Sequence, residues 1–267
     1  MNIFKHEFNM KIKSIIIWSL SLSAFIIFYM AFFPSMAEDS QMFDSIMNSF
    51  PEEMMQALGI REGLSLASLI GFFTLTFTMI QLAMAIQSAN YGFSILSEEE
   101  RELTADFLLS KPVSRSKIYL SKFFAAFTGL LITSLAVGIG SFISLELFNG
   151  GESYEVSKLV KLIVAMPVFQ TVFLSLGMFI SLLFKKVRSV LSLSMALAIG
   201  LYVISSVGEI VDSDILRYMT PFYYFEAGAI LRSGKYNIQL LLLAIAIIIV
   251  SLTSSYILYK RRDIHSL

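Results

Sequence analysis

The sequence contains no cysteine and only two histidines, His6 and His265, which lie near the two ends of the chain. Without cysteine the chain has no disulfide bond, no thiol nucleophile and no cysteine-ligated metal. It also has no H-E-x-x-H zinc motif and no G-x-S-x-G nucleophile motif. We therefore predict no catalytic residue and no metal site, and an intramembrane enzyme is disfavoured.

Charged residues are also scarce, at 15% of the chain, whereas soluble domains contain about 25%. The twenty basic and twenty acidic residues cancel, so the whole chain has no net charge with which to attract nucleic acid. Hydrophobic residues make up 56%, and the mean hydropathy of +0.74 gives a water-soluble fold more apolar surface than it could bury. The composition predicts an integral membrane protein surrounded by lipid bilayer, with no nucleic-acid partner.

Six stretches contain no Asp, Glu, Lys or Arg, and each is long enough to cross a bilayer, which takes about 20 apolar residues in a helix. They run from Ser14 to Phe33, Leu64 to Ala89, Phe123 to Leu145, Leu162 to Phe184, Ser189 to Gly208 and Tyr236 to Tyr259. We predict membrane helices at about 14–33, 64–89, 119–147, 160–184, 189–208 and 236–259. Hydrocarbon offers the backbone no hydrogen-bond partner, and the stretches lack the alternating pattern of a membrane barrel. The predicted fold is an all-α integral membrane protein with one transmembrane domain over residues 1–267.

The basic residues are unevenly distributed between the two sets of connecting segments. Fourteen of the 20 Lys and Arg lie in the two terminal segments and in the second and fourth loops, which all fall on one side of a six-helix bundle. Cytoplasmic loops retain positive charge whereas short exported loops do not. We therefore expect both termini to be cytoplasmic.

The first outer loop, residues 34–63, is predicted to contain short amphipathic helices. Its apolar residues fall at helical spacing on either side of Pro51, namely Phe43, Ile46, Met47 and Phe50 before it and Met54, Met55 and Leu58 after it. Such helices lie along the membrane interface. Methionine thioethers can bind copper, but methionine at this spacing is more typical of packing, so no metal is expected.

A second outer segment, before the last predicted helix, carries the aromatic residues Tyr218, Phe222, Tyr223 and Tyr224 around Pro221. Proline forces a break in regular structure there. Aromatic residues are enriched at membrane interfaces, which favours an anchor that fixes the depth of the chain. The alternative is a gate or substrate-contacting hairpin at the outer mouth.

The cytoplasmic segment 97–118 carries the most information. It begins with an acidic run, which suits a helix N-terminus, and its apolar residues Leu103, Phe107 and Leu108 share one helical face before Pro112 ends the helix. Basic residues then lead into the third predicted helix. Such an amphipathic helix can bind a groove on a soluble partner, with its charges fixing the register. The alternative is a helix that lies on the inner leaflet.

This segment resembles that of the type 2 exporter permeases of the ATP-binding cassette transporter superfamily. The resemblance is carried by Glu100, Arg101, Glu102, Thr104, Leu108, Leu109, Pro112, Val113, Ser114, Arg115 and Lys122, while Leu103 replaces the family's usual glycine and Ala105 its usual leucine. The resemblance implies a coupling helix that docks on a nucleotide-binding subunit. The residues expected to couple to the ATPase are Glu100, Arg101, Glu102, Leu103, Thr104, Phe107, Leu108, Leu109, Pro112, Ser114, Arg115 and Lys117.

The phosphate-binding motif G-x-x-x-x-G-K-[ST] is absent, so the ATPase of such a transporter would be a separate chain. The resemblance implies two copies of that ATPase, which would bind ATP and Mg, and a second permease chain, identical or related. It further implies a bacterial cell membrane and export. The neutral and apolar side chains of the predicted helices are compatible with a hydrophobic or amphipathic substrate, such as a peptide, an antibiotic or a lipid-like molecule. The alternative function is a non-transporting membrane scaffold or sensor that recruits a cytoplasmic partner.

The predicted membrane helices are expected to contain no buried ionisable residue, which argues against ion-coupled transport. Their most polar side chains are three glutamines, Gln81, Gln87 and Gln170. We interpret these as hydrogen-bonding residues between helices rather than as substrate ligands.

Overall fold

A computed structural model describes residues 3–38, 65, 67–98, 113–184 and 186–261. All regular structure within these ranges is helical, and six helices are long and apolar enough to cross a membrane. These are α1 (Ile3–Met30), α5 (Leu69–Ile95), α8 (Arg115–Leu147), α9 (Val156–Leu183), α10 (Val190–Ile210) and α14 (Ile238–Arg261). Four short helices complete the described part, namely α2 (Phe33–Glu38), α11 (Asp214–Tyr218), α12 (Pro221–Tyr224) and α13 (Ala227–Ser233). The predicted all-α membrane fold with six spans is confirmed.

The helix ends differ from the ends of the charge-free stretches. The second span begins at Leu69 and not at 64, because the Ser68 side chain accepts a hydrogen bond from the backbone N–H of Gly71 at 3.2 Å and caps the helix. The third span begins at Arg115, where Ser114 caps the helix in the same way. An apolar stretch marks the part of a helix that crosses the bilayer, whereas a capping side chain determines the residue at which the helix begins.

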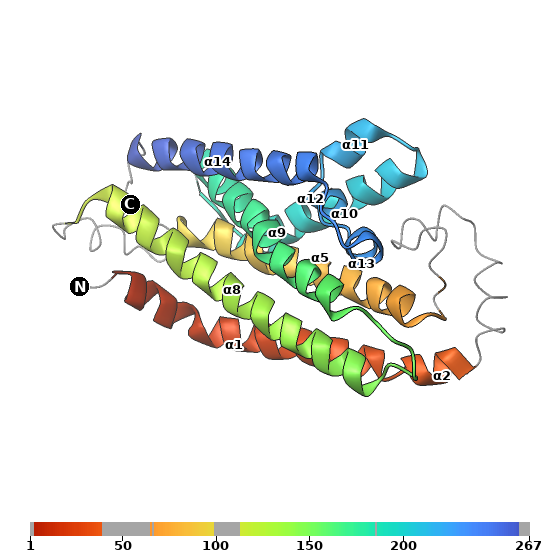
Figure 1. Cartoon of the computed structure of the whole chain (residues 1–267). Helices are drawn as coiled ribbons and strands as arrows, with labels where there is room; N and C mark the ends of the chain where they lie inside the picture. The colour runs from red at the N-terminus through yellow and green to blue at the C-terminus, as the bar shows by residue number, and fades with distance from the viewer. Residues whose placement is uncertain (1–2, 39–64, 66, 99–112, 185, 262–267) are drawn as a thin grey trace.

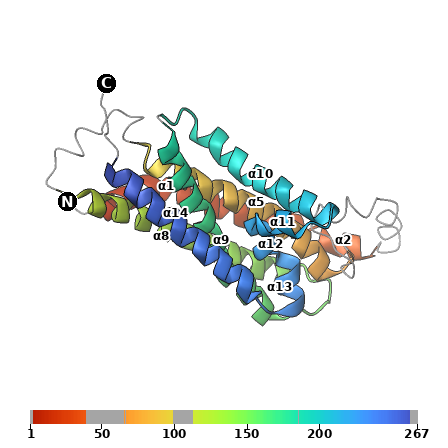
Figure 2. The same cartoon turned by 90° about the horizontal axis from the view of Figure 1, so that it is seen from above.

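The six long helices form an elongated bundle, and the start of α1 and the end of α14 lie at the same end of it (Figure 1). α1 packs along α8, and α5 packs along α9. α10 lies against α5 and α14 lies against α9, so both are at the periphery of the bundle (Figure 2). The amphipathic helices predicted within residues 34–63 fall mostly outside the described residues, and α2 is the described part of that loop.

α5 and α9 form the centre of the bundle, where their glycines allow close contact. A Cβ atom added to Gly92 would overlap the carbonyl oxygen of Leu174 and lie 2.9 Å from the Cα of Gly177. By contrast, a Cβ atom on Gly200 of α10 would meet no heavy atom within 4 Å. The backbones of α5 and α9 therefore pack directly on each other, as small residues permit in membrane proteins.

The glutamines in the spans connect helices, as predicted. Gln87 of α5 donates a hydrogen bond to Thr133 Oγ1 of α8 at 3.0 Å. Gln170 of α9 donates to Gln87 Oε1 at 3.4 Å and accepts a bond of 2.6 Å from Ser134. Gln81 donates to the backbone carbonyl of Phe225 at 2.9 Å. These bonds satisfy buried amides that lipid could not solvate.

Candidate functional site

Most of the predicted coupling residues lie outside the described residues, namely Glu100, Arg101, Glu102, Leu103, Thr104, Phe107, Leu108, Leu109 and Pro112. The structure places the two flanks of this segment. Ser97 and Glu98 follow the last turn of α5, and Val113 and Ser114 precede α8. Both flanks lie at the end of the bundle that holds the start of α1 and the end of α14 (Figure 1). The candidate site therefore consists of these two flanks and of the residues that they contact.

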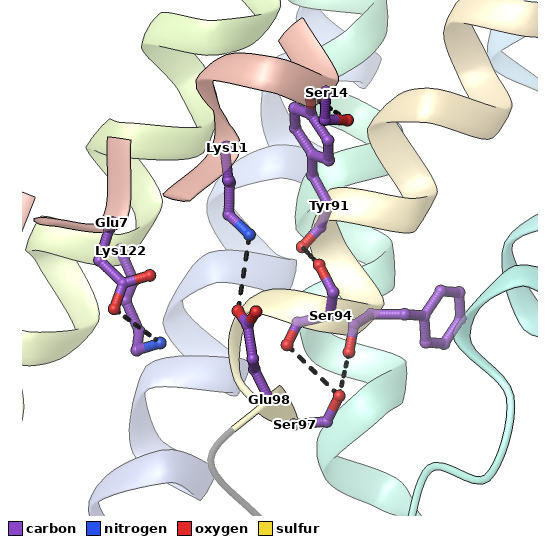
Figure 3. A network of polar contacts seen from close by, with 9 residues as sticks. Glu7, Lys11, Ser14, Tyr91, Ser94, Ser97, Glu98 and Lys122 are labelled. Carbon is purple, nitrogen blue, oxygen red and sulfur yellow. Dashed lines mark hydrogen bonds and ion pairs between the residues drawn. The ribbon is translucent and has the colours of Figure 1, made fainter. Parts of the chain in front are cut away.

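The first flank is tied to α1 through an ion pair. Lys11 Nζ lies 3.6 Å from Glu98 Oε2, and it also lies 5.6 Å from the centre of the Tyr91 ring (Figure 3). The Tyr91 hydroxyl donates a hydrogen bond of 3.2 Å to Ser14, which is also on α1. The end of α5 is thereby fixed to the first helix immediately before the coupling segment begins.

A second ion pair ties α1 to the beginning of α8. Lys122 Nζ lies 3.1 Å from Glu7 Oε1 (Figure 3), and the two side chains are 1% and 7% exposed. The second carboxylate oxygen of Glu7 accepts no hydrogen bond from the described residues. Burying each of these charges costs several kcal/mol, and only a close partner offsets that cost. Loss of Lys122 would therefore leave the buried carboxylate of Glu7 without this cation.

The buried Lys122 corrects the expectation that the predicted helices contain no buried ionisable residue, because it lies within the predicted 119–147 helix. The partner of Lys122 is Glu7, and the spacing of the residues in α1 indicates that Glu7 faces the bundle. The buried residues of α1 recur every three or four positions from Ile3 to Met30, and Glu7 and Lys11 fall on this stripe. Because α1 starts at Ile3 rather than at 14, the stripe reaches beyond the apolar stretch and places Glu7 opposite α8.

The second flank is tied to the last helix. Arg115 Nη1 donates hydrogen bonds to the backbone carbonyl oxygens of Lys260, at 3.1 Å, and of Tyr259, at 3.4 Å. These are among the carbonyls at a helix C-terminus that have no partner within the helix itself. The hydroxyl of Ser116 lies 2.7 Å from that of Tyr256, and the hydroxyl of Tyr119 donates to the carbonyl of Leu252 at 3.0 Å. α8 therefore contacts α14 from Arg115 onward, which is the first residue after the N-cap of α8.

Lys117, the remaining described member of the predicted set, is exposed, and its backbone N–H donates to the capping Ser114 at 3.3 Å. Its ammonium group is therefore accessible at the surface of this end of the bundle. Together the contacts join the flanks of the predicted coupling segment to α1 on one side and to α14 on the other. Such an arrangement suits the transmission of movement.

The predicted outer aromatic segment runs from α11, in the half of the bundle away from the coupling segment, into the bundle at α12 (Figure 1). The predicted break at Pro221 is present, because Pro221 is the first residue of α12 and Thr220 caps that helix. Phe222 is buried, and its ring lies 5.3 Å from that of Phe169 and 5.4 Å from that of Tyr202. The aromatic segment is therefore packed into the bundle through Phe222.

The tyrosines of this segment differ in their exposure. Tyr224 is buried, Tyr223 is half-buried and Tyr218 is exposed. The Tyr224 hydroxyl donates a hydrogen bond to the backbone carbonyl of Tyr218, and burial raises the pKa of Tyr224 to about 12. Tyr224 therefore remains a neutral donor at physiological pH and holds α12 against the preceding turn.

Comparison with known protein families identifies one match, and it covers almost the whole chain. The family described as ABC-2 family transporter protein matches residues 1–264. No curated protein matches the sequence. The six apolar helices agree with the multi-pass membrane subunits of that family, which generally work with separate ATP-binding subunits. The chain therefore belongs to the ABC-2 family of transporter proteins.

Proposed function

We propose that this chain is the permease subunit of an exporter, driven by ATP that a separate ATPase hydrolyses while docked on residues 97–118. Family membership supports the role of permease. The observation that carries the proposal is that both flanks of this segment are held by other membrane helices, through the Lys11–Glu98 and Arg115–Lys260 contacts. A segment that only lay on the inner leaflet would not need such connections.

The route by which ATPase movement enters the bundle follows from these contacts. A displacement of the docked segment pulls on Glu98 and on the first turn of α8, and the Glu7–Lys122 pair passes it to α1. Because this pair is buried, its attraction is much stronger than that of a solvated pair. Arg115 passes the same movement to α14. We infer that α1, α8 and α14 move together, as in the rigid-body transitions of other switching proteins.

The assembly that we propose contains two ATPase subunits, which bind ATP and Mg, and a second permease chain. Outward movement of substrate would then occur at the end of the bundle that carries the aromatic segment. A hydrophobic or amphipathic substrate, such as a peptide, an antibiotic or a lipid-like molecule, is consistent with spans whose charge-free stretches offer only neutral polar groups.

The proposal is tested by co-purification from mild detergent with candidate ATPase subunits. The variant Leu108→Asp places a charge on the predicted docking face, and Ile215→Asp makes a comparable change at the opposite end of the bundle, where Ile215 is 76% exposed. We expect Leu108→Asp to lose the ATPase and its ATP turnover, and Ile215→Asp to retain both. Retention of ATPase by both variants would show that docking occurs elsewhere, and absence of any ATPase partner would favour the scaffold or sensor.

A further inference from the structure

A hollow of about 270 Å³ lies between α12, α13 and the beginning of α14. These elements lie in the half of the bundle away from the start of α1 (Figure 1). Sites for drug-sized ligands usually measure about 300–1,000 Å³. The hollow therefore has room for a head group or a single side chain, but not for a whole large substrate. Its lining combines three tyrosines, Tyr223, Tyr224 and Tyr236, with the carboxylate of Glu226 and the ammonium group of Lys235.

The walls of the hollow are held in place by α9. The Tyr236 hydroxyl donates a hydrogen bond of 2.7 Å to the backbone carbonyl of Lys161, and Lys161 Nζ donates one of 2.8 Å to the carbonyl of Gly234. Gly234 ends α13 in the left-handed conformation, with φ of 63°, and so turns the chain toward Lys235 and α14. These bonds fix the loop that forms one side of the hollow before any ligand arrives.

The electrostatics of the hollow are those of two opposite charges beside neutral aromatic rings. Glu226 is only 17% exposed, and Arg232 Nη2 lies 3.9 Å from its Oε1. Lys235 is exposed at the rim. Burial holds Tyr224 in its neutral form, so the charged groups of the lining are the Glu226 carboxylate, which Arg232 also contacts, and the Lys235 ammonium group. Tyrosine rings and a carboxylate together attract an organic cation, while a lysine attracts a phosphate as a point charge.

We propose that this hollow binds a zwitterionic group in which an ammonium is joined to a phosphate, as in the phosphoethanolamine head group of a phospholipid. The ammonium lies against Glu226 and the tyrosine rings, and the phosphate faces Lys235. An anionic head group without an ammonium would leave Glu226 with no ligand partner, so it binds less well. This inference concerns the permease alone and does not depend on ATP, on an ATPase or on the direction of transport.

The test is native mass spectrometry of the purified chain in mild detergent with short-chain lipids. Dihexanoyl-phosphatidylethanolamine is compared with dihexanoyl-phosphatidylglycerol, which shares the phosphate but has no ammonium. We expect the wild type to bind the ethanolamine lipid about tenfold more tightly. Glu226→Gln should abolish this preference, whereas Lys235→Gln should weaken both lipids by a similar factor. Lys13→Gln, which changes an exposed lysine of α1 at the opposite end of the bundle, should change neither.

The source of the group is distinguished by competition with soluble glycerophosphoethanolamine. If it displaces the lipid, the hollow recognises the group in free solutes as well as in the bilayer, and if it does not, the bilayer lipid is the ligand. Equal binding of the two lipids by the wild type would overturn the proposal. So would an unchanged preference in the Glu226→Gln variant, and circular dichroism identifies any variant that fails to fold.

Discussion

The substitution Lys122→Met tests the buried ion pair between α1 and α8. It removes the ammonium that lies 3.1 Å from Glu7 and leaves a carboxylate that is 7% exposed without its cation. Removing one partner of a buried pair costs about 3–5 kcal/mol. The second substitution Glu7→Leu removes the stranded charge, so the double variant should recover most of that loss, because apolar replacements of a buried pair are often neutral.

The assay is unfolding in mixed micelles with increasing fractions of sodium dodecyl sulfate, followed by tryptophan fluorescence. Trp18, the one tryptophan of the chain, is on α1 and reports on the helix under test. As a control, Lys158→Met breaks a partly exposed pair with Glu155, whose side chain is 64% exposed, and should cost about 0–1 kcal/mol. A loss below about 1 kcal/mol for Lys122→Met, or a double variant no more stable than Lys122→Met, would refute the reasoning.

Three further predictions concern the packing, the second flank and the orientation. Gly92→Ala should destabilise the bundle by about 1–3 kcal/mol in the same unfolding assay, whereas Gly200→Ala should be neutral or stabilising by up to about 1 kcal/mol, because only the first Cβ meets a neighbouring backbone. Arg115→Gln removes a charged donor from the last turn of α14, so hydrogen exchange of the amides there should become about tenfold faster, and an unchanged rate would contradict the proposed tie. Because the chain lacks cysteine, Ile215→Cys should react with a membrane-impermeant maleimide in intact cells and Lys186→Cys only after permeabilisation, and the reverse result would invert the predicted orientation.

The number and order of the membrane helices could be predicted from the sequence because the bilayer imposes a length on any charge-free stretch. The helix ends could not, since they depend on which serine caps the backbone, as Ser68 does for α5. α1 shows the limit of hydropathy most clearly. Its first residues are polar enough to belong outside the membrane, yet they continue the helix, because Glu7 and Lys11 find partners on α8 and next to α5.

The coupling role of Arg115 stays a prediction, and the structure adds its contacts. Arg115 lies at the flank of the segment, and its contact with the carbonyls of α14 could not be inferred from a single chain segment. The ion pair of Lys122 with Glu7 was missed because the two residues are far apart in the sequence and meet only when α1 packs along α8. Similarly, Pro221 indicated a break, whereas the inward packing of Phe222 depends on α9 and α10.

The most direct test of the central claim is a nucleotide-dependent distance measurement by pulsed electron paramagnetic resonance on the permease bound to its ATPase. Spin labels are placed at Lys13→Cys on α1 and Lys186→Cys between α9 and α10, both exposed and both at the end that carries the coupling segment. An excess of unlabelled permease restricts the signal to one labelled chain. The account predicts that ATP analogue and Mg shift the distance distribution, because docked movement reaches α1 through the Glu98 and Lys122 ion pairs. An unchanged distribution in a complex that binds nucleotide would contradict it.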